Sequence, residues 1–350
     1  MSRPTLRTIE GTTPGPRLPR RGRPTAYGFT LVELLVTITI IGILASVALG
    51  VMGMAKETAR VARTRALVAK IDRVIAEQWQ SYQTRRVRGL PVTANRLLNH
   101  RYLVNARREL MRMEMPDRWS DVTDNLGATP ILPRATSAFL PNVPGKTYSY
   151  LSRANEAKRK GATPEQIRQN GAAELLYLIV ANSPYANEFN DRDRGDVDGD
   201  GLFEFHDAWG RPIRFLLWPA GYLASNAADT EIMDPSVPDP FDTLQVIPGG
   251  DYAMYPLIYS AGPDAIYDVN IGKQPADPTG NDVYSYRLIP DSTVSGWPGD
   301  WRMVQGDLNS PAVLVGTPLD GTGPDGESAD GQLSHYDNIH NHRLESTDAR

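Results

Sequence analysis

Residues 28–55 read GFTLVELLVTITIIGILASVALGVMGMA, and this stretch decides how the rest of the chain is organised. Glu33 is its only charged residue. A run of about 20 apolar residues crosses the hydrocarbon core of a bilayer as a helix. The length of this run and its lack of polar alternation favour a buried helix over a strand. We therefore expect one transmembrane helix over residues 29–55.

Charge is distributed unevenly on the two sides of this run. Of the 350 residues, 1–27 carry six Arg and one Glu, 56–118 carry a net charge of +9, and 185–350 carry −19. The basic leader, residues 1–28, predicts a cytoplasmic N-terminus by the positive-inside rule. A secretory signal peptide or a plain anchor would share these features, although the run is long and lacks a clear small-x-small cleavage site.

The junction between the basic leader and the apolar run carries a specific motif. Gly28-Phe29-Thr30-Leu31-Val32-Glu33 resembles the signal of type IV prepilins and type II secretion pseudopilins. The resemblance implies that prepilin peptidase cuts after Gly28 and that the new N-terminal residue, Phe29, is methylated. It also implies a filament subunit that meets other pilin or pseudopilin subunits, an inner-membrane assembly platform and membrane lipid. Such a protein is single-pass in the cytoplasmic membrane, with its head extracytoplasmic, and enters a periplasmic or cell-surface filament.

Glu33 is the acid expected to direct assembly. An ionised carboxylate inside hydrocarbon costs several kcal/mol, so its presence there indicates a function. Its natural partner is the new amino group of Phe29 on a neighbouring subunit. The alternative is a side chain that reaches out to interfacial water.

Residues 56–90 predict an amphipathic stalk that continues the same helix to about residue 86. The apolar positions follow helical spacing, at Val61, Val68, Ile71, Ile75, Trp79 and Tyr82. The basic residues of 56–118 also fit a nucleic-acid surface. Because the aromatic residues lie on the apolar stripe, we favour core packing and expect no nucleic acid partner.

Residues 91–184 predict an insert of helices and loops. One or two helices are expected within 92–115 and a long loop over 119–150. A further helix is expected to begin at Thr163-Pro164, which fits an N-cap followed by proline in the first turn, and to run to about Ala181.

The acidic stretch that follows fits a twelve-residue calcium loop. The candidate ligands are Asp196, Asp198, Asp200, the carbonyl of Leu202, Glu204 and Asp207. A solvated acidic turn would have the same composition, and magnesium is less well suited because it keeps more of its water. The chain contains no cysteine, which excludes disulfides and thiolate zinc sites, so calcium is the expected staple of the head.

Residues 207–215, DAWGRPIRF, resemble a strand signature of the major pseudopilin of type II secretion. Residues 259–264, YSAGPD, more weakly resemble the calcium loop of that family, which adds as candidate ligands Asp264, Asp268 and Asp282. Strands are expected within 211–218, 253–260 and 283–289. Residues 185–309 would then form an acidic β head, and residues 310–350 a disordered tail.

The sequence thus predicts a pilin-like α+β fold: a long N-terminal transmembrane helix packed on a small antiparallel sheet, with calcium-bound loops and a helical insert. No catalytic constellation or nucleotide-binding loop is evident, so we expect a structural protein and not an enzyme. Two functions remain open. The first is a subunit of a type II secretion pseudopilus or type IV pilus-like filament, and the second is a membrane-anchored calcium-dependent binding module or adhesin that does not polymerise.

Overall fold

The computed structural model describes residues 28–222, 233, 236–248, 252–267, 269, 271, 286–289, 297–303, 315–317 and 338–343. The chain divides into two compact units, Met1–Ala55 and Lys56–Arg350. The basic leader before Gly28 lies outside the described residues.

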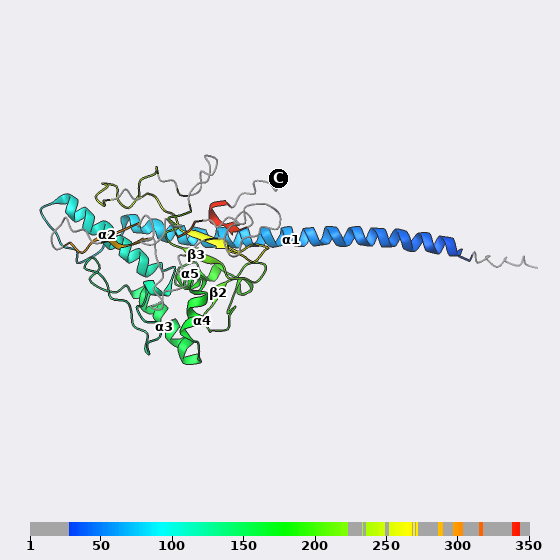
Figure 1. The fold of residues 1–350 in the computed structure, drawn as a ribbon, viewed down its shortest axis with the longest axis horizontal. Coiled ribbons are helices and arrows are strands. Elements are labelled where there is room, and N and C mark those ends of the chain that lie inside the picture. Colours follow the sequence, from blue (N-terminus) through cyan, green and yellow to red (C-terminus); the bar gives the residue numbers. More distant parts are fainter. Residues whose placement is uncertain are drawn as a thin grey trace, which may run out of the picture. The chain divides into compact units, whose positions relative to one another are not determined.

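Helix α1, Leu31–Thr84, confirms the predicted long helix (Figure 1). In the first unit its large apolar side chains are exposed, from 49% for Val36 to 84% for Phe29, which just precedes the helix. Among the described residues it is the one helix long and apolar enough to cross a membrane, and its most apolar 18-residue window has a mean hydropathy of 2.6. An apolar surface of this extent requires lipid or other protein to cover it.

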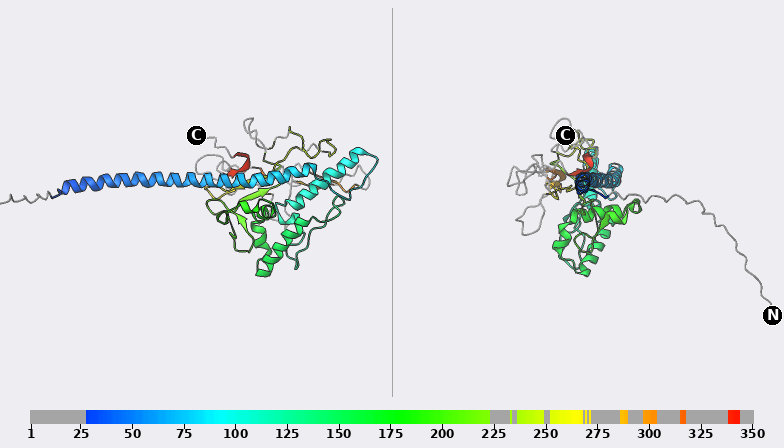
Figure 2. Two further views of the ribbon diagram at one scale, coloured as in Figure 1. Left: turned by 180° about the vertical axis from the view of Figure 1, so that it is seen from behind. Right: turned by 90° about the vertical axis from the view of Figure 1, so that its right-hand side faces the viewer.

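In the part of the second unit that the structure describes, four further α-helices follow α1 in the chain: α2 (Arg96–Glu114), α3 (Gly145–Lys160), α4 (Pro164–Gln169) and α5 (Gly171–Ala181). Short 3-10 helices cover Trp119–Asp121, Ala186–Glu188, Asp191–Asp193 and Asn341–Arg343. Figures 1 and 2 show α3, α4 and α5 grouped on one side of the second half of α1. This arrangement gives the insert expected over 91–184 a helical core.

Two helix boundaries differ from the sequence-based expectation. The loop predicted over 119–150 is wrong from Gly145 onward, because α3 begins there without a capping side chain that would mark its start. The helix predicted from Thr163 is capped as expected, since Thr163 and Gln166 form a reciprocal capping box. It is then interrupted at Asn170, which divides it into α4 and α5.

Within the described residues, the strands are short and form three antiparallel sheets. They are β1 (Arg194–Gly195), β2 (Glu204–Phe205), β3 (Arg214–Leu216), β4 (Leu257–Ser260), β5 (Tyr286–Ile289), β6 (Asp300–Met303) and β7 (Ile339–His340). β1 pairs with β2, β5 pairs with β6, and β4 lies between β3 and β7. The neighbouring strands expected within 211–218 and 253–260 are therefore confirmed. The third expected strand, β5, pairs with β6 and not with them.

The core of the second unit is built around the apolar stripe of α1. The stripe is buried as predicted, at Val68, Ile71, Ile75, Trp79 and Tyr82, and it packs in one cluster with side chains of α2, α3, α5 and the strands. The ring of Trp79 meets Phe241 edge-on, with 5.0 Å between the ring centroids. The indole of Trp79 therefore packs in the protein core, as we expect for an aromatic residue on the apolar stripe of α1.

Part of the segment expected to be a disordered tail is folded. Val315 is buried, and its carbonyl accepts a hydrogen bond of 2.7 Å from the backbone amide of Gly221. Ile339 and His340 form β7, which pairs with Ser260 and Tyr259 of β4. A strand of two residues is too short to show the alternation of polar and apolar residues that predicts a strand. For this reason the composition of the segment did not indicate β7.

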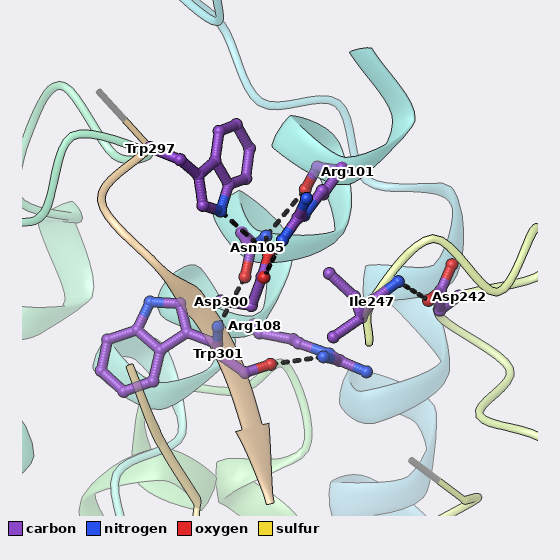
Figure 3. Close-up of polar contacts among 8 residues, drawn as sticks. All are labelled: Arg101, Asn105, Arg108, Asp242, Ile247, Trp297, Asp300 and Trp301. Atoms are coloured by element: carbon purple, nitrogen blue, oxygen red, sulfur yellow. Dashed lines mark hydrogen bonds and ion pairs between the residues drawn. The ribbon is translucent and has the colours of Figure 1, made fainter. Parts of the chain in front are cut away.

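A buried polar network joins α2 to β6, as Figure 3 shows. The carboxylate of Asp300 accepts hydrogen bonds from Arg101 Nε at 2.9 Å, Asn105 Nδ2 at 2.8 Å and Trp297 Nε1 at 3.2 Å. Asn105 Oδ1 in turn accepts from the backbone amide of Trp301 at 2.6 Å. Asp300 is only 1% exposed, so these donors replace the water that its charge has lost.

The same helix face binds the neighbouring loop. Arg108 donates to the Trp301 carbonyl and to the carboxylate of Asp239. Close by, Asp242 closes its own loop by accepting the backbone amide of Ile247 at 2.8 Å (Figure 3). The two bonds of Arg108 thus fasten α2 to residues that lie 131 and 193 positions after Arg108 in the chain.

Candidate functional site

The N-terminal motif forms the start of α1. Thr30 precedes the helix, and Glu33 Oε2 accepts hydrogen bonds of 2.9 Å from both the backbone N–H and the Oγ1 of Thr30. The Thr30 hydroxyl accepts from the Glu33 amide at 3.2 Å. This is a reciprocal capping box, which satisfies backbone donors that the first helical turn leaves unpaired. The motif thus fixes where the helix begins.

The capping box also places the Glu33 carboxylate next to the predicted cleavage site. Its oxygen binds the amide of Thr30, the residue that directly follows Phe29. Apolar side chains surround this end of the helix, and none of the large ones from Phe29 to Met54 is buried. Glu33 is therefore the one acid on an exposed apolar surface that begins at Phe29.

The acidic loop of the second unit is shaped by its own side chains. Asp196 accepts the backbone amides of Gly199 at 2.7 Å and Gly201 at 2.9 Å, and Asp200 accepts that of Leu202 at 2.7 Å. Gly199 and Gly201 have φ angles of +79° and +93°, which favour glycine. The repeated Asp-Gly pattern therefore produces the tight turn that the sequence predicts.

Three carboxylates converge where this loop meets α5. One oxygen each of Glu174, Asp198 and Asp200 lie within 4.8 Å of one another. Glu174 is fully buried and Asp200 is 3% exposed, whereas Asp198 is half-buried. Glu204, the neighbouring acid on β2, is also fully buried. Buried carboxylates at such short separations repel one another unless they are protonated or a cation lies between them.

The electrostatics of these groups reflect that crowding. Burial raises the pKa of Glu174 well above its usual value, and the charge of Asp200 adds to the effect. Burial likewise raises the pKa of Asp200 to about 6 and that of Glu204 to about 8, and the neighbouring aspartates add to both shifts. Negative charge is therefore poorly accommodated at this cluster by the protein alone.

Neighbouring residues hold Glu174 and Asp198 in place. The indole N–H of Trp119 donates to Glu174 Oε2 at 2.9 Å. A Cβ built on Gly171, the first residue of α5, would come within 2.8 Å of the Trp119 ring, so glycine allows the indole to approach. Asn170 Nδ2, at the α4–α5 junction, donates to Asp198 Oδ2 at 3.0 Å.

Asp207, predicted to close the calcium loop, has different partners. Its Oδ1 accepts the amides of Trp209 at 2.8 Å and Arg211 at 2.9 Å, and its Oδ2 accepts the hydroxyl of Ser260 at 2.7 Å. Trp209 Nε1 donates to Glu57 of α1 at 2.9 Å. The DAWGRP motif is thus a turn that fastens the strand region to α1, and Asp207 supports that turn.

The second predicted calcium loop receives no support from the described residues. Asp264 is exposed and accepts the amide of Ile266 at 2.9 Å, and Ser260 is engaged with Asp207. Asp268 and Asp282 lie outside the described residues.

Sequence reasoning missed Glu174. The signal was present, because it is the single acid in the otherwise apolar stretch AAELLYLIVA, and a buried acid in such a helix points to a partner. The carboxylates near it, Asp198 and Asp200, come later in the chain, and the local pattern of α5 does not reveal that they lie close to Glu174. The indole of Trp119, which orients Glu174, lies 55 residues earlier in the chain.

Comparison with known proteins identifies one region. The family model described as the prokaryotic N-terminal methylation motif matches residues 23–49. No curated protein and no solved structure matches the chain. The match includes Gly28, Phe29 and Glu33 and the first part of α1, and it leaves the second unit unassigned.

Proposed function

We propose that this chain, which carries the type IV prepilin and pseudopilin signature, is a structural subunit of a type II secretion pseudopilus or type IV pilus-like filament. The observation that carries the proposal is the matched motif joined directly to an apolar helix with exposed side chains. In a filament, the equivalent helices of neighbouring subunits would cover that surface. The proposed role is structural and involves no catalysis by the chain.

Processing would precede assembly. Prepilin peptidase would hydrolyse the peptide bond after Gly28, which leaves a free amino group on Phe29, and methylation of that group would follow. The capping box then has a second use, because it holds the Glu33 carboxylate beside the new N-terminus. Pairing of this carboxylate with the amino group of Phe29 on the next subunit would neutralise two charges in an apolar filament core.

Before assembly, the subunit would be held in the cytoplasmic membrane by α1, with residues 1–28 in the cytoplasm and the head outside. Its partners would be the prepilin peptidase and methylase, the inner-membrane assembly platform, membrane lipid and other subunits. The DAWGRP turn supports a pseudopilin-like head, since it binds α1 through Glu57 and, at the amide of Ala208, through Thr64.

The decisive experiment replaces Glu33 by Gln. Gln serves in capping boxes as Glu does, so Glu33→Gln keeps the start of α1 while it removes the negative charge. We expect this variant to be cleaved after Gly28 and methylated at Phe29, as intact mass of the purified chain would record. We expect it to be lost from filaments sheared from cells.

A matched control is Thr37→Val, which removes a hydroxyl that bonds only along the helix, to the Glu33 carbonyl at 2.6 Å. This variant should assemble like the wild type. Normal incorporation of Glu33→Gln into filaments would contradict the assembly role, and an uncut wild-type chain would contradict processing.

The second candidate function is a membrane-anchored calcium-dependent binding module or adhesin that does not polymerise. The buried acidic cluster in the second unit favours it, because such a cluster suits a cation. The same experiment separates the two functions: the head of an adhesin would act from the cell surface whether residue 33 carries a charge or not.

A further inference from the structure

We propose that Glu174, Asp198 and Asp200 bind one calcium ion that joins helix α5 to the acidic loop. Their converging oxygens lie within 4.8 Å of one another and come from two segments of the chain. This ligand set differs from a calcium loop closed by Asp207, because it takes Glu174 from the insert instead. The proposal concerns the second unit alone and stands whether or not the chain enters a filament.

The cluster contains buried oxygen atoms without hydrogen-bond partners. Glu174 Oε1 and Asp200 Oδ2 are both in this condition, and so is Glu204 Oε1 beside them. Each of these residues is at most 3% exposed. An unpartnered buried carboxylate oxygen costs free energy, and three together cost more than isolated ones because their charges repel. A cation bound by Glu174, Asp198 and Asp200 would offset the negative charge that these buried acids bring together.

The chemistry of the ligands selects the cation. All available atoms are oxygens, and carboxylates supply most of them, so a hard divalent ion is expected rather than a transition metal. Calcium accepts many protein oxygens in a flexible arrangement, whereas magnesium keeps several waters and demands regular octahedral geometry. Because much of the cluster is buried, water is a poor source of ligands there, and calcium fits better.

The ion would also connect separate segments of the second unit. Glu174 is bound by Trp119, and Asp198 is bound by Asn170 at the break between α4 and α5. A cation shared by Glu174 and the loop would therefore join the insert, the helix break and the start of β2. A chain without cysteine has no disulfide for this purpose. An ion that binds the folded state alone stabilises that state, and the stabilisation grows with the ratio of the free ion concentration to the dissociation constant.

The test compares variants of the full-length chain in detergent micelles, stripped of metal with EDTA and titrated with calcium chloride by calorimetry. We expect the wild type to bind one calcium ion and to melt at a higher temperature with calcium than with EDTA. Glu174→Gln should weaken calcium binding at least about tenfold, because it removes one charged ligand. Asp207→Asn should bind calcium within about threefold of the wild type, since that carboxylate serves a turn.

A second measurement distinguishes a metal ligand from a structural residue. In EDTA, Glu174→Gln should melt at a higher temperature than the wild type, because Gln still accepts from Trp119 and the cluster has one acid fewer to repel the others. A purely structural Glu174 predicts the opposite sign. Asp198→Asn provides an independent variant at a half-buried position, and it should also lose calcium binding.

Three results would overturn the proposal. They are a wild type that does not bind calcium, a loss of binding in Asp207→Asn that Glu174→Gln does not show, and binding of magnesium chloride as tight as that of calcium chloride.

Discussion

Tyr82 donates its phenol O–H to the carboxylate of Glu114 at 2.7 Å, and both side chains are buried. This bond joins the last turn of α1 to the last turn of α2. Arg85 adds an ion pair of 2.9 Å to the same carboxylate, and Tyr150 of α3 donates to the Glu114 carbonyl at 2.7 Å. One acid thus holds the end of the long helix against two helices of the insert.

Replacement of Tyr82 by Phe should lower the free energy of unfolding by about 2 kcal/mol, because it leaves a buried carboxylate with one donor fewer. The measurement is urea unfolding of the full-length chain in detergent, followed by the near-ultraviolet signal of the head. Tyr148→Phe is the control, since Tyr148 is 53% exposed on α3, and its effect should stay within about 0.5 kcal/mol. Equal effects of the two variants would mean that the bond to Glu114 contributes nothing.

Replacement of Gly171 by Ala should destabilise the second unit by about 1–3 kcal/mol, although Ala is the better helix former. The reason is the Trp119 ring, which lies 2.8 Å from where the new Cβ would stand. Gly145→Ala at the start of α3 is a matched control, because nothing lies within 4 Å of its added Cβ. Thermal unfolding of the two variants should therefore shift in opposite directions or leave Gly145→Ala unchanged.

Replacement of Asp300 by Ala should cost about 3–5 kcal/mol, because it leaves the Arg101 guanidinium in a nearly buried position without its main carboxylate. Asp191→Ala removes an aspartate whose ion pair with Arg194 is at the surface, and it should cost at most about 1 kcal/mol. The comparison uses urea unfolding. A cost for Asp300→Ala as small as that for Asp191→Ala would show that the network of Figure 3 is not a source of stability.

Glu109 should contribute a pH dependence of defined sign. Burial raises the pKa of this carboxyl above its usual value of 4.5, although the Ser137 amide donates to it at 2.5 Å. As the pH rises, the unfolded chain loses this proton first, so the contribution of Glu109 to stability falls until the native carboxyl also ionises.

Glu109→Gln keeps an acceptor for Ser137 and removes that fall. The difference in unfolding free energy between the wild type and Glu109→Gln should therefore change as the pH rises past the usual pKa of 4.5, with the wild type losing relative stability. Parallel curves for the two chains across this pKa would refute the assignment.

The first part of the chain could be predicted from sequence because its determinants are local. The motif at Gly28 to Glu33, the apolar run and the stripe from Val68 to Tyr82 each specify their structure within a few turns. The N-cap at Thr163 is equally local, and the structure confirms it. Such features can be predicted without knowing which residues they contact in the folded core.

Other features depend on distant partners. Asp207 fits a calcium loop by spacing, and only the fold shows that Ser260 also donates to its carboxylate. Glu174 is the single acid in an otherwise apolar part of α5, and only the fold brings it near Asp200. α3 and β7 were missed for the related reason that packing, and not a capping or periodic signal, defines them.

The pairing of β7 with β4 joins two strands that are synthesised at different times. Ser260 meets Ile339, which a ribosome makes about 80 residues later, so roughly 4–16 s pass between them at about 5–20 residues per second. Asn341 then donates a hydrogen bond of 2.7 Å to Asp72 of α1, a residue that is synthesised much earlier. Until that moment one edge of β4 is open, and an open edge invites pairing with foreign strands. A chain that stops before β7 cannot close this edge, so completion of the sheet requires that translation has passed residue 340.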